Sequence, residues 1–339
     1  MRFGWRGALG LALSVALLIW ALRGVDPGDV WRELGAANPA LLLASACVAT
    51  ITFPVRAMRW RSILEPVAPA IAFGPLWRAT AIGMMVNNVV PARAGELARA
   101  FALTREVPRV SFSASFASLA VDRLFDALVL LLLLLVAMLD PAFADRTSIG
   151  DDVAGWVGWA MLIAALFLAV LYCIVLFPAW IVSLYEAFAR RVAPRFEERG
   201  RALILSFATG LGVLRSPRRF AVVLGWALAH WLLNALAFWI GFRAVGIGAP
   251  FTAALFLQGI IAIGVALPSS PGFFGVFEAF AKTGLAVYGV GATEAVSWAI
   301  GFHLLSFVPI TVIGAYYFTR LGLHFRELRE AEEGAGERR

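Results

Sequence analysis

Residues 87–96, NNVVPARAGE, and residues 268–278, PSSPGFFGVFE, interrupt two apolar stretches of the chain at corresponding places. Each stretch turns polar, carries proline and glycine, and then resumes with a glutamate, Glu96 or Glu278. Proline lacks a backbone N–H and clashes with the preceding turn, so these sequences do not continue a helix through lipid. The freed backbone groups must face protein or a water-filled cavity. Two broken segments in matching halves are typical of a transporter with a binding site between them.

We therefore expect segments 75–105 and 250–288 to be re-entrant hairpins that enter the membrane from opposite sides, as an inverted repeat. The alternative is that each break only kinks an ordinary span, which is common in membrane helices. The residues that we expect to form the two breaks are Pro91, Gly95, Pro268, Pro271, Gly272 and Gly275.

The composition identifies a membrane protein. Of 339 residues, 61% are hydrophobic and 15% are charged, whereas a soluble domain is about half apolar and a quarter charged. This excludes a soluble globular protein, a disordered chain and a nucleic-acid-binding domain, in spite of a net charge of +7. Two cysteines and three histidines without ligand spacing indicate neither a disulfide framework nor a metal site, and we expect no cofactor.

The apolar stretches predict an all-α polytopic protein, because a membrane-spanning helix needs about 20 mostly apolar residues. We expect about six full spans plus the two broken segments, or about eight spans if each broken segment counts as one. A shorter stretch, 201–214, lies among arginines and is expected to be an interfacial or half-buried helix. The expected spans are 7–22, 39–55, 111–139, 153–177, 220–242 and 296–319.

Arginine placement predicts the orientation. Arginines precede the first span, follow the second, crowd residues 190–219 and follow the last span, while loop 140–152 is acidic. By the positive-inside rule both termini are cytoplasmic, in the cell (inner) membrane. We expect one transmembrane domain over residues 1–325, with repeat halves of about 39–139 and 220–319, followed by a charged cytoplasmic tail, 326–339.

The expected span 111–139 carries a polar stripe at helical spacing. Its members fall within an arc of roughly 80° at about 100° per residue, and Arg123 lies outside that arc. Because a carboxylate in hydrocarbon is costly, the stripe must face the bundle interior or water. Helix–helix contact and the lining of a cavity are both open as its role. The stripe consists of Ser111, Ser115, Ser118, Asp122 and Asp126.

Charged side chains also follow each break. Glu96 is spaced to pair with Arg93 or Arg99, and Glu278 with Lys282, so each glutamate is either neutralised by a neighbour or lines a polar cavity. In the second interpretation the basic residues hold a phosphate headgroup beside exposed backbone N–H groups. Asn87 and Asn88 either bind a headgroup or cap freed carbonyls, and we favour capping.

Four motifs in this order resemble the lysylphosphatidylglycerol synthase transmembrane-region family, also called flippase-like membrane proteins. The resemblance covers nearly the whole chain and departs from the family pattern at Asp122, where a glutamate is expected, and at Phe273-Phe274. The motifs are Arg56-x-x-Arg59-Trp60, Asn88-x-x-Pro91-x-Arg93-x-Gly95-Glu96-x-x-Arg99, Asp122-Arg123-x-x-Asp126 and Pro268-x-Ser270-Pro271-Gly272-x-x-Gly275-x-x-Glu278.

The resemblance implies an integral membrane protein that moves lipids between leaflets. In multidomain members this region flips aminoacylated phosphatidylglycerol, which a separate soluble domain makes, and stand-alone relatives are linked with hopanoid or polyprenyl-glycolipid export. We do not expect the synthase activity here.

The sequence thus predicts a lipid flippase rather than an enzyme, with a polar cavity between the two broken segments. Alternatives are a scaffold or accessory subunit of a lipid-modifying synthase and an intramembrane enzyme of a lipid pathway. Expected partners are phospholipid, hopanoid or polyprenyl-linked lipids and no nucleic acid, while a homodimer or a partner synthase stays open. We expect Arg56 and Arg59 at the headgroup layer. The expected substrate-binding residues are Asn87, Asn88, Arg93, Glu96, Arg99, Asp122, Arg123, Asp126, Ser269, Ser270, Glu278 and Lys282.

Overall fold

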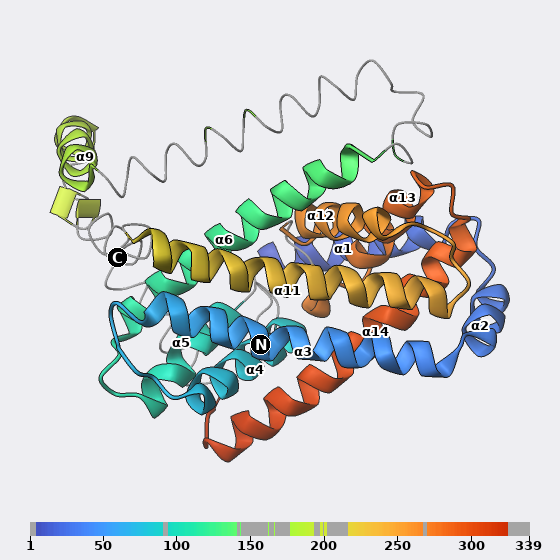
Figure 1. The fold of residues 1–339 in the computed structure, drawn as a ribbon, viewed down its shortest axis with the longest axis horizontal. Coiled ribbons are helices and arrows are strands. Elements are labelled where there is room, and N and C mark those ends of the chain that lie inside the picture. The colour runs from blue at the N-terminus through green and yellow to red at the C-terminus, as the bar shows by residue number, and fades with distance from the viewer. Residues whose placement is uncertain are drawn as a thin grey trace.

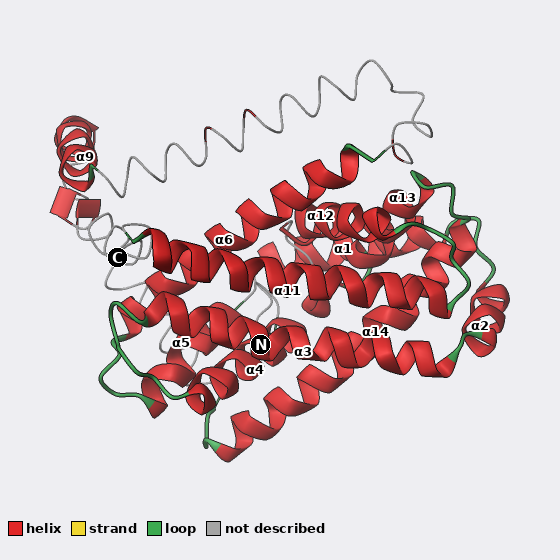
Figure 2. Cartoon of the chain, in the orientation of Figure 1, coloured by secondary structure: helices red, strands yellow, loops and turns green. Residues whose placement is uncertain are grey.

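A computed structural model describes most of the chain as helices. The described residues are 5–90, 94–140, 143, 162, 166, 177–192, 197–198, 200–201, 216–266 and 270–324. Every regular element among them is helical (Figures 1 and 2), which confirms the all-α prediction for this part of the chain. Nearly all of segments 153–177 and 201–214, and all of the tail 326–339, lie outside the described residues.

Several of the described helices begin at a residue whose side chain caps the first turn. Asn38 caps α3, Ser111 caps α6 and Ser216 caps α11, each with a side-chain oxygen that accepts from the first turn. The elements are α1 (Trp5–Leu22), α2 (Pro27–Ala36), α3 (Pro39–Leu64), α4 (Phe73–Val89), α5 (Gly95–Glu106), α6 (Phe112–Met138), α9 (Pro178–Val192), α11 (Pro217–Ala244), α12 (Phe251–Ala266), the 3₁₀ turn η4 (Pro271–Phe273), α13 (Val276–Ala286) and α14 (Ala292–Arg320).

Three of the described helices, α3, α11 and α14, are long and apolar enough to cross a membrane. A fourth span results if α1 and α2, which meet at a bend of 77°, count as one. Helix α6 is as long, but it carries Asp122, Arg123 and Asp126 inside its apolar sequence. These helices agree with a helical membrane protein, and the total number of spans stays a prediction.

Helices α3 and α11 lie side by side and form the centre of the molecule (Figure 1). They are antiparallel, because residues at the start of α3 contact residues at the end of α11. The N–H of Asn38 donates to the carbonyl of Ala244, and the hydroxyl of Ser45 to that of Ala237. This pair fixes the position of the other helices around it.

The two broken segments both form helical hairpins, α4–α5 and α12–α13. The first packs on α14 and the second on α6, so each hairpin contacts the last long helix of the other half of the chain. Helices α4 and α5 cross closely through two glycines, since a Cβ on Gly95 would lie 2.2 Å from the carbonyl oxygen of Gly83. Gly95, expected as a break residue, therefore permits the tight crossing that follows the break.

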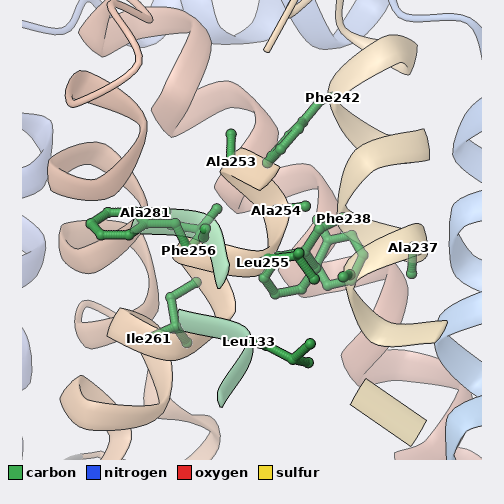
Figure 3. Packing of buried hydrophobic residues seen from close by; sticks show 14 of the residues in the cluster. Leu133, Ala237, Phe238, Phe242, Ala253, Ala254, Leu255, Phe256, Ile261 and Ala281 are labelled. Atoms are coloured by element: carbon green, nitrogen blue, oxygen red, sulfur yellow. The ribbon is translucent and has the colours of Figure 1, made fainter. Parts of the chain in front are cut away.

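The core lies where α6, α11, α12 and α14 meet. Phe238 of α11 packs edge-on against Trp298 and Phe302 of α14, with ring centroids 5.1 and 4.8 Å apart. Figure 3 shows the neighbouring side chains from α11, α12 and α6 interdigitated around Phe238. Because a buried aromatic cluster packs at crystal-like density, it holds these helices in one arrangement.

Candidate functional site

A buried cluster of arginines and aspartates joins α3 to α6. Arg59 donates from Nε to Oδ1 of Asp122 at 2.6 Å and from Nη1 to Oδ1 of Asp126 at 2.7 Å. Arg56 donates from Nη2 to Oδ2 of Asp126 at 3.1 Å. All four residues are at most 6% exposed. Both arginines, expected at the headgroup layer, thus lie inside the protein among carboxylates.

Helix spacing explains the geometry. Arg56 and Arg59 are three residues apart on α3, and Asp122 and Asp126 four apart on α6, so each pair occupies one helix face. The hydroxyl of Ser118, one turn earlier on α6, accepts from Nε1 of Trp60 at 2.7 Å. Four residues of the predicted polar stripe, Ser115, Ser118, Asp122 and Asp126, are therefore buried in the bundle, while Ser111 is exposed and caps α6.

Two further helices, α5 and α11, and Arg123 of α6 itself contribute to the same cluster. Arg99 of α5 donates to Oδ2 of Asp122 at 3.2 Å, and its guanidinium lies over the Trp60 ring. Arg123 of α6 is hydrogen-bonded to Glu96 of α5. Trp231 of α11 donates from Nε1 to Oδ1 of Asp126 at 2.9 Å. Asp126 thus receives donors from α3, α6 and α11.

The charges of this cluster do not cancel among the described residues. Four arginines (Arg56, Arg59, Arg99 and Arg123) face three carboxylates (Asp122, Asp126 and Glu96), which leaves one positive charge. Within the described part, Nη2 of Arg59 and both Nε and Nη2 of Arg99 are buried without a hydrogen-bond partner. A buried donor without an acceptor is costly, so an acceptor-rich anion would complement this cluster.

Beside the cluster lies a cavity of about 560 Å³ between α6, α11 and α12. Its polar wall comprises Arg123, Asp126, Trp231, Asn234 and Gln258. Most of the remaining wall is hydrocarbon. Ile263, which is 59% exposed, also lines the cavity, so it reaches the outer surface of the bundle. The apolar wall is formed by Ala127, Leu130, Leu131, Leu134, Phe238, Gly259, Ile261, Ala262, Ile263, Val265 and Ala266.

Two carboxamides meet at the polar side of this cavity. Asn234 of α11 donates from Nδ2 to Oε1 of Gln258 on α12 at 3.2 Å. Gln258 is 2% exposed, and its Nε2 has no hydrogen-bond partner among the described residues. A carboxamide carries donors and an acceptor, so Gln258 keeps a buried, unpaired donor at the wall of the cavity.

The first break is held by asparagines. Oδ1 of Asn87 accepts from the backbone N–H of Gly95 at 2.9 Å, so Asn87 satisfies a freed N–H at the break, whereas the sequence favoured a cap on freed carbonyls. Asn88 donates from Nδ2 to the hydroxyl of Thr311 on α14 at 2.7 Å. The predicted site residues Pro91 and Arg93 lie outside the described residues.

The second break folds around Glu278 and His303. Oε2 of Glu278 accepts from the N–H of Gly275 at 2.6 Å, and Oε1 lies 2.7 Å from Nδ1 of His303. Nε2 of His303 lies 2.8 Å from the carbonyl oxygen of Gly272. Gly272 and Gly275 have φ values of +69° and +86°, which glycine adopts without a Cβ penalty.

Helix α1 supports this break from outside. Ser14 accepts from the N–H of Ser270 at 2.7 Å. Lys282 donates from Nζ to the carbonyl oxygens of Ala21 and Arg23 at 2.9 and 2.8 Å. Lys282 therefore caps the end of α1. The structure does not pair it with Glu278, which was one of the two interpretations of the sequence. Two other predicted residues of this break, Pro268 and Ser269, lie outside the described residues.

The arginine-rich ends of α3 and α11 share a second cavity of about 850 Å³. Arg61 of α3 and Arg218 and Arg219 of α11 line it together with Glu65 and Ser216. The sequence predicts that these arginines lie on one side of the membrane, and the structure brings the end of α3 and the start of α11 together. Among the described residues, no group of three His, Cys, Asp or Glu side chains is arranged to hold a metal ion.

Several residues of these sites were not among the predicted site residues, including Gln258, Asn234, His303 and Trp231. Gln258 is the one carboxamide in the otherwise apolar α12, and a polar residue at membrane depth is a signal that the sequence did offer. A lone histidine in a span, such as His303, is more often a packing residue than a proton relay, and its sequence context leaves both roles open. Trp231 gives no such signal, because its role depends on the helix that faces it.

Comparison with known proteins gives the family. The model of the lysylphosphatidylglycerol synthase TM region matches residues 7–314. The chain belongs to this family. Its members are membrane proteins, and the apolar helices α3, α11 and α14 fit a membrane-embedded chain.

Curated relatives extend the comparison. A UPF0104 membrane protein of Methanothermobacter thermautotrophicus is 28% identical, over 89% of this chain and 90% of its own length. A second UPF0104 membrane protein of that organism is 22% identical over 91% and 94%. Glycosyltransferase AglD of Haloferax volcanii is 38% identical over 123 residues. That match spans 36% of this chain and only 19% of AglD.

Proposed function

We propose that this membrane protein is a transporter of the lipid flippase type, rather than an enzyme, and moves a phospholipid or lipid-linked headgroup between leaflets. One observation carries the proposal: the cavity beside Asp126 has charged and carboxamide groups on one wall and hydrocarbon on the rest. A lipid has the same two parts. Its headgroup would contact Arg123, Asn234 and Gln258, while its chains leave past Ile263 into the bilayer.

The charges favour a headgroup that carries phosphate. The cluster behind the cavity holds one positive charge in excess among the described residues, and several of its N–H groups are buried without partners. Arginine and phosphate form strong, charge-assisted hydrogen bonds. Arg123, which is 40% exposed at its side chain, lies where cluster and cavity meet.

The helix arrangement supports the inverted repeat that such a transporter needs. Each hairpin, α4–α5 or α12–α13, packs on the last long helix of the other half, and the two hairpins lie toward opposite ends of the molecule in Figure 1. We infer repeat halves of α3–α6 and α11–α14 around the antiparallel α3 and α11. With the arginine-lined cavity on the cytoplasmic side, both termini are cytoplasmic in the cell membrane.

The comparisons support lipid as the ligand class. The family is named for a synthase of lysylphosphatidylglycerol, which is a phospholipid, and AglD is named a glycosyltransferase. Phospholipids, hopanoids and polyprenyl-linked lipids all combine a polar head with hydrocarbon, and the cavity suits that combination.

The test is transbilayer movement in proteoliposomes, with fluorescent phosphatidylglycerol and a fluorescent polyprenyl phosphate as probes. The full chain should move at least one probe between leaflets. Gln258→Leu should slow that probe about tenfold or more, because it removes the carboxamide that faces the headgroup, a loss of about 1.4 kcal/mol or more.

The matched control is Ala315→Phe, an exposed position on α14 that does not line the cavity. It should move lipid at the wild-type rate. Wild-type protein that moves neither probe, or Gln258→Leu at the wild-type rate, would contradict the proposal. Capture of a lipid-modifying synthase by such inactive protein would favour the scaffold alternative.

A further inference from the structure

The two ring nitrogens of His303 both contact hydrogen-bond acceptors, so the site needs one proton more than a neutral histidine beside an ionised glutamate provides. The carbonyl oxygen of Gly272 can only accept, so Nε2 of His303 must carry the hydrogen of that 2.8 Å contact. In a neutral imidazole Nδ1 is then an acceptor. Yet Nδ1 lies 2.7 Å from Oε1 of Glu278, which is also an acceptor when ionised.

A proton between these two atoms resolves the conflict. Either His303 is an imidazolium beside a carboxylate, or Glu278 is a carboxylic acid that donates to a neutral ring. Both forms hold one proton more than a neutral histidine beside a carboxylate. Without that proton, two lone pairs would face each other at 2.7 Å in a buried site, where Glu278 is 2% and His303 7% exposed.

We propose that Glu278 and His303 form a proton-binding site whose occupancy holds the second broken segment closed. The inference rests on the proposed function, because it makes proton binding the input that the transport cycle uses. When the proton leaves, the Glu278–His303 contact becomes repulsive and α13 separates from α14 at this point.

The site is built into the break itself. Glu278 also binds the N–H of Gly275, and His303 binds the carbonyl oxygen of Gly272, so protonation joins both ends of the turn to α14. The ring of Phe274 stacks on His303 with centroids 4.4 Å apart, and Phe277 lies at 4.7 Å. These rings keep the shared proton away from solvent.

Among the described residues, no other charged side chain on the surrounding helices forms a hydrogen bond or ion pair with Glu278 or His303. Helix α12 carries no charged residue. Lys282 on α13 binds backbone carbonyls of Ala21 and of Arg23, the residue after α1. On α14, Glu294 accepts from Gly291 and Arg320 lies against Tyr316, and on α4 Arg78 pairs with Glu106. On α2, Asp29 pairs with Arg32, and Glu33 is the third charged residue of that helix. The remaining basic groups are Arg56, Arg59 and Arg61 of α3 and Arg218, Arg219, His230 and Arg243 of α11.

The variant Glu278→Gln imitates the protonated site. A glutamine can accept from Gly275 with its oxygen and donate to Nδ1 of His303 with its nitrogen, so the turn stays closed without a removable proton. Glu294→Gln is the matched control. Glu294 accepts from the N–H of Gly291 in the first turn of α14, as Glu278 accepts from Gly275 in the first turn of α13, but it lies far from His303.

The first measurement counts the proton. The chain has three histidines, so full-length protein with ¹⁵N-histidine and ¹³C-glutamate in nanodiscs gives few histidine signals, and His303→Gln assigns the site. We expect that the pair holds one shared proton, seen as either a doubly protonated His303 ring or a protonated Glu278 carboxyl, with Glu294→Gln unchanged. A neutral His303 ring beside an ionised Glu278 carboxylate would overturn the proposal.

The second measurement tests the coupling in proteoliposomes that carry fluorescent phosphatidylglycerol, with and without a pH gradient. The gradient should change the wild-type and Glu294→Gln rates several-fold and leave the Glu278→Gln rate unchanged. A wild-type rate of lipid movement that is the same with and without the pH gradient would overturn the coupling of transport to proton binding and leave the proposed function standing. No lipid movement in any variant, with the shared proton still observed, would overturn the proposed function instead.

Discussion

Nε of Arg59 on α3 lies 2.6 Å from Oδ1 of Asp122 on α6, with both side chains removed from solvent. This contact joins residues that are 63 positions apart in the chain and lie on different helices. A charge in such a site is tolerated only while its partner is present, because its desolvation is not otherwise compensated. The arginine–aspartate cluster therefore holds α3, α5, α6 and α11 in register behind the cavity.

Replacing Arg59 by Met should destabilise the protein by about 3–5 kcal/mol, since it leaves Asp122 and Asp126 buried with a donor missing. The measurement is the free energy of unfolding in mixed micelles. The double variant Arg59→Met/Asp122→Leu should recover part of that loss, because neither charge is then left alone. A cost within about 1 kcal/mol for Arg59→Met would show that the contact is not needed.

Replacing Trp231 by Phe should cost about 1.5–3 kcal/mol, the range for a hydrogen bond to a charged group, because Asp126 loses the donor at 2.9 Å. It should also slow lipid movement, since Trp231 forms part of the cavity wall. Trp31→Phe is the control, at a side chain that is 71% exposed on α2. Equal stability of the two variants would contradict this role of Trp231.

Gly95→Ala should destabilise the first hairpin by about 1–3 kcal/mol, because its Cβ would lie 2.2 Å from the carbonyl oxygen of Gly83 and force α4 and α5 apart. Gly225→Ala on α11 meets nothing within 4 Å and should stabilise its helix by up to about 1 kcal/mol. Thermal unfolding in detergent compares the two. A neutral Gly95→Ala would show that the helices do not cross as described.

Lys282→Met should loosen the end of α1, because the carbonyls of Ala21 and Arg23 lose the donor that satisfies them. Hydrogen exchange over residues 19–26 should accelerate about tenfold, which corresponds to about 1.4 kcal/mol of local stability. Exchange in α11 serves as the internal reference. Unchanged exchange at the end of α1 would show that Lys282 does not hold it.

How far the sequence reaches differs between the parts of the molecule. The helical class, the two breaks and the buried face of α6 follow from local signals: proline and glycine inside apolar stretches, and carboxylates at helical spacing. The partner of each charge does not, because spacing along one helix predicts only neighbours on that helix. Glu278 and Lys282 are spaced for an ion pair, yet the structure gives them contacts with α14 and α1.

The same limit applies to the cavity. Gln258, Asn234 and Trp231 come together only because α11 and α12 pack beside α6, and no local pattern contains that packing. Arg56 and Arg59 also show that a local pattern does not predict the packing of one helix against another. Arginines just beyond an apolar stretch indicate a headgroup layer, but two aspartates on α6 draw them into the bundle.

The most direct test of the lipid site is native mass spectrometry of the purified protein beside Ala262→Phe, which fills the cavity, and Ala315→Phe, which adds the same ring outside it. The account predicts that wild type and Ala315→Phe retain one class of lipid, and that Ala262→Phe retains about a tenth as much or less. Equal retention by all three proteins, or no selective lipid on the wild type, would contradict it.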